Sequence, residues 1–98
     1  MARYTVSPKA RRDLIDIWKY IAQDSLQHAD RWLERVYQVF VFLGLEPRMG
    51  STSDEIHPGT RKFPLGNYII YYRVTSRGVQ VLHVFHGKRD QRKAFEKR

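Results

Sequence analysis

Residues 60–86 read TRKFPLGNYIIYYRVTSRGVQVLHVFH, and this stretch decides the fold. Gly66-Asn67 is a two-residue hairpin signal, and residues 76–78, Ser-Arg-Gly, have the composition of a second turn. The segments 60–65, 68–75 and 79–86 have the length and the β-branched and aromatic content of strands. Pro64 cannot donate a ladder hydrogen bond, so the first segment belongs at an edge or ends there. The stretch predicts a three-stranded antiparallel meander.

Side chains alternate between the two faces of a strand, so each segment predicts two sets of neighbours. In the middle segment the sets are Tyr68, Ile70, Tyr72 and Val74 against Ile69, Tyr71, Arg73 and Thr75. In the last segment they are Val79, Val81, His83 and Phe85 against Gln80, Leu82, Val84 and His86. Apolar groups on both faces indicate a central strand. His83 and His86 project to opposite faces, which excludes a site that uses both.

The N-terminal half predicts one strand and two helices. Residues 3–6 form a short strand, and Ser7-Pro8 is a helix start because Ser supplies a cap and Pro fits the first turn. Apolar residues then recur at helical spacing to about residue 24 and again from Ser25 to Gly44, while residues 48–59 have loop composition. The expected fold is a single α+β domain over residues 1–98, with the order β-α-α-β-β-β and the helical hairpin packed on one face of a small, mostly antiparallel sheet.

The charge of the chain is unevenly distributed. Net charge is +8, yet residues 1–58 hold eight Lys/Arg and eight Asp/Glu, whereas residues 59–98 hold ten and two. An acidic partner is therefore expected to approach the C-terminal half. The chain has no cysteine, no motif with metal-ligand or phosphate-loop spacing and no apolar run long enough to cross a bilayer. These features predict a soluble cytoplasmic protein without a cofactor or metal.

The apolar stripes of both helices are broader than one sheet contact requires. The surplus consists of Trp18, Trp32, Tyr37, Val39 and Phe42. Two interpretations stay open: a groove that accepts an amphipathic segment of a partner, or a wide stripe that covers a twisted sheet.

A ribonuclease would need an acid, a base and cations around the scissile phosphate. The candidates are Arg61, Arg73, His86 and Arg89. No spacing in the sequence forces them together.

The whole chain resembles the ParE/RelE superfamily of toxins from bacterial toxin–antitoxin modules. The resemblance rests on YTVSPKARRDLIDIWKYIA, LEPRMG, RKFPLGNYIIYYRV and VLHVFHGKRD, in that order. The chain is more similar to the ParE branch, because the first helix carries Ala10, Asp13, Leu14 and Ile17 in an A-x-x-DL-x-x-I pattern and the last strand closes in HG-x-RD.

The resemblance implies a non-enzymatic toxin that binds DNA gyrase and is neutralised by an acidic antitoxin. The target-binding residues would be Tyr71, Arg73, His86, Lys88 and Arg89. The surplus apolar residues of the helices, Trp18, Trp32, Tyr37, Val39 and Phe42, would bind the antitoxin. Two alternatives stay open: a RelE-type endoribonuclease that cuts messenger RNA at the ribosome with Arg61, Arg73, His86 and Arg89, and a non-toxic binding or regulatory module on the same scaffold.

Overall fold

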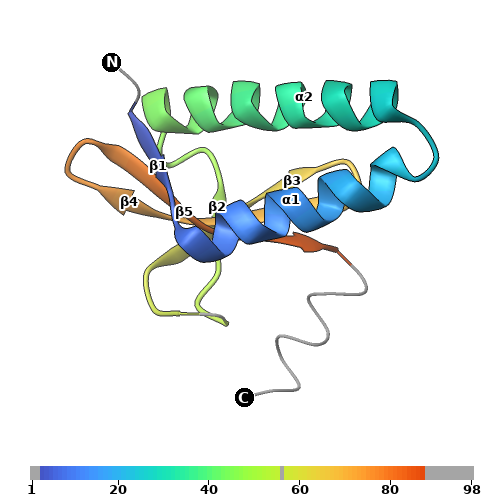
Figure 1. Cartoon of the computed structure of the whole chain (residues 1–98). Helices are drawn as coiled ribbons and strands as arrows, with labels where there is room; N and C mark the ends of the chain where they lie inside the picture. The colour runs from blue at the N-terminus through green and yellow to red at the C-terminus, as the bar shows by residue number, and fades with distance from the viewer. Residues whose placement is uncertain (1–2, 56, 88–98) are drawn as a thin grey trace.

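The computed structural model describes residues 3–55 and 57–87 (Figure 1). The elements in chain order are β1 (Tyr4–Val6), α1 (Pro8–Ala22), α2 (Leu26–Leu45), β2 (Ser51–Thr52), β3 (Thr60–Leu65), β4 (Tyr68–Thr75) and β5 (Gly78–His86). The predicted order, the two helices and the meander are confirmed. β2 was not predicted, because a two-residue strand leaves no periodic signal in a loop-like segment.

The strands form one sheet in the order β1-β5-β4-β3-β2. β1 runs parallel to β5, and the other neighbours are antiparallel. Both helices lie over the same face of this sheet (Figure 1). Pro64 lies in β3, next to the edge strand β2, which reaches only as far as Lys62. Within the described residues, neither helix is long and apolar enough to cross a membrane.

The helices begin where the sequence predicts. The Ser7 hydroxyl accepts a hydrogen bond from the Ala10 N–H at 3.0 Å, and the Ser25 hydroxyl accepts one from the His28 N–H at 3.1 Å. The core lies between the helices and the sheet. It is built from Ala10, Leu14, Ile17, Val36, Phe40, Leu43, Leu65, Ile70, Tyr72, Val79, Val81 and Val84.

β5 contains a bulge, and the side chains after the bulge lie on the opposite face of the sheet from the one that the sequence predicted. Tyr72 pairs with Val81 and Tyr71 pairs with His83, so Leu82 has no partner on β4. One extra residue reverses the alternation after it. His83 and Phe85 therefore do not share the core face with Val79 and Val81, as the regular alternation predicted. They lie on the face opposite the helices, which we call the open face.

Two polar side chains near the start of α1 hold the bulge. Ser7 donates its N–H to the Val81 carbonyl at 2.9 Å and its hydroxyl to the Leu82 carbonyl at 3.0 Å. Asp13, buried on α1, accepts a hydrogen bond from the Val84 N–H at 3.0 Å. β1 pairs with β5 only as far as Val81, so these side chains satisfy the backbone groups that β1 leaves unpaired.

The LEPRMG segment after α2 is fixed by Tyr72 and Arg61. The Tyr72 hydroxyl donates to the Pro47 carbonyl and accepts from the Gly50 N–H, each at 2.8 Å. The Arg61 guanidinium donates to the Gly50 carbonyl at 2.6 Å and to the Arg48 carbonyl at 3.3 Å. A Cβ on Gly50 would lie 2.5 Å from the Tyr72 oxygen, so only glycine fits. This motif has a structural role.

Candidate functional site

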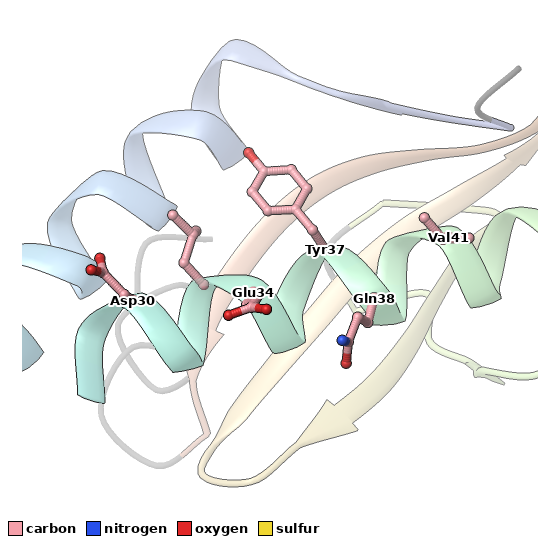
Figure 2. Close-up of a pocket in the computed structure, with 6 residues that line it drawn as sticks. Asp30, Glu34, Tyr37, Gln38 and Val41 are labelled. Carbon is pink, nitrogen blue, oxygen red and sulfur yellow. The ribbon is translucent and has the colours of Figure 1, made fainter. Parts of the chain in front are cut away.

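A groove runs along the outer side of the helical hairpin. One hollow of about 470 Å³ is lined by Asp30, Leu33, Glu34, Tyr37, Gln38 and Val41. A second, of about 200 Å³, is lined by Arg11, Leu14, Ile15, Trp18, Leu33 and Tyr37. They share Leu33 and Tyr37, so they are continuous, and we call them together the hairpin groove. Figure 2 shows Tyr37 extending from α2 toward α1, with Asp30, Glu34, Gln38 and Val41 along the same helix.

The hairpin groove has an apolar floor and a polar rim. The exposed fraction is 48% for Ile15, 50% for Val41 and 38% for Tyr37. These fractions are high for large apolar side chains that lie close to one another. At the rim, the Trp18 indole N–H donates to the Asp30 carboxylate at 3.0 Å. Arg11 and Glu34 make no ion pair within the described part of the chain. Exposed apolar surface flanked by available charges suits an amphipathic helix.

The residues predicted to contact an antitoxin divide between two places. Trp18 and Tyr37 line the hairpin groove. Trp32 and Val39 are half-buried and pack against the core, with the Trp32 ring 5.4 Å from the Tyr68 ring between centroids. Phe42 lies against Phe63, at 6.0 Å. One part of the broad apolar stripe therefore covers the sheet and another part lines the groove. That the groove binds a partner stays a prediction.

Four apolar residues that line the groove were not among the predicted antitoxin-binding residues: Leu14, Ile15, Leu33 and Val41. Leu33, Tyr37 and Val41 are spaced four residues apart, which places them along one line of α2. That spacing was the available signal. The prediction instead selected residues that extend beyond the minimal core face of each helix.

The predicted target-binding residues lie on both faces of the sheet. Arg73 is exposed on the open face and donates its Nε–H to the Gln80 side chain at 2.7 Å. Tyr71 lies on the same face but is fully buried, so its ring is not available to a partner. His86 pairs with Tyr68 at the other end of β4 and β5, on the helix side. Lys88 and Arg89 lie outside the described residues.

The ribonuclease candidates are not brought together. Arg61 faces the helix side, where its guanidinium binds the carbonyls of the LEPRMG segment, and Arg73 points to the opposite face. His86 lies at the far end of β5 from Gln80, the partner of Arg73. Arg89 lies outside the described residues. Within those residues no cluster of three or more His, Cys, Asp or Glu side chains could hold a metal ion.

Two ionisable side chains with shifted pKa values, His83 and Tyr71, lie together on the open face. Burial lowers the pKa of His83, and nearby Lys9 and His57 lower it further, although Asp13 acts in the opposite direction. Burial, and then the Glu55 carboxylate, raise the pKa of Tyr71. Neither the His83 Nδ1 atom nor the Tyr71 hydroxyl has a hydrogen-bond partner among the described residues. Both side chains are therefore neutral near pH 7.

Comparisons with known proteins agree with this geometry. Residues 4–91 match the family model described as ParE toxin of type II toxin-antitoxin system, parDE. The chain is 33% identical over 91 residues to Toxin ParE1 of Mycobacterium tuberculosis (strain CDC 1551 / Oshkosh), covering 91% of this chain and 93% of the relative. It is 29% identical over 87 residues to Toxin ParE1 of Caulobacter vibrioides, covering 88% and 90%.

A solved chain described as the chromosomal ParDE TA system from P. aeruginosa has the same fold. The TM-score is 0.65 at 20% sequence identity, over 88% of this chain and 96% of that one. The family match, with an antitoxin partner implied by it, covers β1 through β5. The chain belongs to the ParE toxin family of type II toxin–antitoxin systems.

Proposed function

We propose that this protein arrests growth by binding DNA gyrase and stabilising its cleaved-DNA state, and that an acidic antitoxin neutralises it by laying an amphipathic helix in the hairpin groove. The gyrase part rests on membership of the ParE family. The antitoxin part is carried by one observation, the exposed apolar side chains of Ile15, Tyr37 and Val41 beside the available Arg11 guanidinium.

The charge distribution supports separate surfaces for the two partners. Residues 59–87 contain Arg61, Lys62, Arg73 and Arg77 but no Asp or Glu. Lys62 on β3 and Arg73 on β4 both lie on the open face, because Lys62 pairs with Tyr71 and Thr60 pairs with Arg73. This face is separated from the hairpin groove by the sheet and the core. We assign Arg73 on the open face to target binding. The roles of His86, Lys88 and Arg89 stay predictions, because His86 lies on the helix side and the other two lie outside the described residues.

The test is a supercoiling assay with purified gyrase, relaxed plasmid and increasing amounts of the protein. We expect supercoiling to be lost and linear DNA to appear after denaturation of the enzyme, with prior addition of the antitoxin restoring activity. Arg73→Ala should weaken inhibition, whereas Arg31→Ala on the exposed side of α2 should not. Normal supercoiling at a large excess of a protein that stops growth would overturn the gyrase assignment, and primer extension on translated messages would then test RNA cleavage.

A further inference from the structure

The open face also carries a pair of histidines that the proposed function does not use, His57 and His83. His83 on β5 lies opposite Tyr71 on β4, because the bulge at Leu82 turns it away from the helices. On the open face the His83 ring stacks on Phe85, with centroids 5.1 Å apart and planes 11° apart. The ring of His57, from the segment before β3, also stacks on His83, at 6.1 Å and 21°.

His57 is held locally by its backbone. Its carbonyl accepts a hydrogen bond from the Thr60 N–H at 3.2 Å, and the Ser53 N–H donates to the Thr60 carbonyl at 2.8 Å. The side chain of His57 is exposed, whereas the Nδ1 atom of His83 is buried. The stack therefore joins an exposed ring to a half-buried one, and this contact connects the segment before β3 with β5.

The charges that face His83 come from each element around it. From α1 come Lys9, whose ammonium lies 5.7 Å from the Phe85 ring centroid, and Asp13, which pairs with Lys9 and accepts the Val84 N–H. From the segment before β3 comes His57, and from β4 comes the neutral Tyr71 hydroxyl, which itself faces the Glu55 carboxylate. The Asp13 carboxylate partly offsets a new charge on His83, but burial of the ring outweighs it.

We propose that the His57–His83 stack is a proton-sensitive contact, closed while the His83 ring is neutral and opened when that ring takes up a proton in mildly acidic solution. A charge on the half-buried ring of His83 costs desolvation energy that exposure to water would recover. Acid therefore releases His57 and admits water to His83 and Tyr71. The inference concerns the open face and holds for any target.

Hydrogen exchange of the Thr60 amide tests the proposal on the full chain. This amide donates to the His57 carbonyl, so its protection reports the position of that residue. After correction for intrinsic exchange, we expect protection to fall between pH 7.5 and 5, by at most about tenfold per pH unit for one linked proton. The amide of Ile70 in the buried part of β4 should stay more strongly protected than that of Thr60 at every pH, which separates local opening from unfolding.

Matched variants make the result specific. His83→Phe keeps an aromatic ring but removes the proton site and should weaken the pH dependence at Thr60. His28→Phe, an exposed position on α2, should keep the full dependence. A wild-type Thr60 amide whose corrected protection is constant over this range would overturn the proposal. So would a His83→Phe variant with an undiminished pH dependence.

Discussion

The carboxylate of Asp13 on α1 accepts a hydrogen bond from the backbone N–H of Val84 on β5, with Oδ2 and N 3.0 Å apart. A helix side chain thus takes the place of a strand at the outer edge of the sheet. Ala10, Leu14 and Ile17 from the same motif are buried in the core beside it. The residues of the A-x-x-DL-x-x-I pattern therefore hold the first helix against the last strand.

Replacing Asp13 should be costly for stability. Asp13→Ala leaves the Val84 N–H without its partner, and a lost hydrogen bond to a charged group costs about 2–3 kcal/mol of unfolding free energy. Asp13→Asn keeps an acceptor oxygen and should cost less. Urea denaturation measures both, with exposed Asp16→Ala as the control, which should change stability by less than about 0.5 kcal/mol. Equal stability of Asp13→Ala and Asp16→Ala would contradict this role.

The adjacent tyrosines of β4 should respond oppositely to loss of their hydroxyls. The Tyr72 hydroxyl makes two hydrogen bonds that fix the LEPRMG segment, so Tyr72→Phe should cost about 1–3 kcal/mol by leaving buried groups unpaired. The Tyr71 hydroxyl is buried without a partner among the described residues, so Tyr71→Phe should be neutral or stabilising. Thermal or urea unfolding of the two variants decides. A larger loss in Tyr71→Phe would disprove the assignment.

Gly78 and Gly66 offer a comparison of crowding with backbone strain. Both have positive φ, 151° and 59°, but a Cβ on Gly78 would lie 1.8 Å from the Arg3 carbonyl oxygen, whereas Gly66 faces open space. Gly66→Ala should cost about 1–2 kcal/mol, the strain of a left-handed residue. Gly78→Ala adds a backbone clash and should cost roughly 3 kcal/mol or more. Similar urea midpoints for the two variants would contradict this prediction and show that the backbone at Arg3 moves away from the added Cβ at little cost.

Stability should fall in mild acid because of His83. Its pKa in the unfolded chain is near the ordinary 6.5 and is lowered in the folded protein by burial, so the unfolded chain binds more protons in the window just below pH 6.5. The free energy of unfolding therefore decreases as pH falls through that window. It becomes constant once the pH is below the pKa that His83 has in the folded protein. His83→Phe should flatten this slope, while His28→Phe should retain it. Urea midpoints between pH 7.5 and 5 provide the measurement.

The sequence was sufficient for the parts of the fold that follow regular periods. Helical spacing located the core residues of α1 and α2, and the caps at Ser7 and Ser25 were predicted from composition. The bulge at Leu82 was not predictable, because apolar residues stand on both faces of β5 and a shift by one residue leaves the pattern plausible. Its position depends on Ser7 and Asp13, which are 75 and 71 residues away in the chain from their bonding partners.

The candidate site was predictable only in outline for the same reason. Periodicity showed that the helices carry surplus apolar surface, and Tyr37 was identified from it. Periodicity does not say which edge of a stripe covers the sheet. Trp32 and Val39 pack against the core, whereas Ile15 and Val41 line the groove. The way α1 crosses α2 decides which of these side chains are covered.

A charge placed in the hairpin groove should separate neutralisation from toxicity. Tyr37→Glu puts a carboxylate in the apolar floor, and loss of a buried aromatic anchor costs about 2 kcal/mol or more of binding, roughly a thirtyfold increase in Kd for the antitoxin. Leu26→Glu, an exposed position of α2 that lines neither hollow, is the matched control and should bind as wild type does. Titration calorimetry with the cognate antitoxin measures both. In cells, Tyr37→Glu should stop growth even when the antitoxin is co-expressed at a level that rescues the wild-type protein, since the open face is unchanged. Unaltered antitoxin affinity in Tyr37→Glu would place the antitoxin elsewhere on the toxin, whatever the toxin's target.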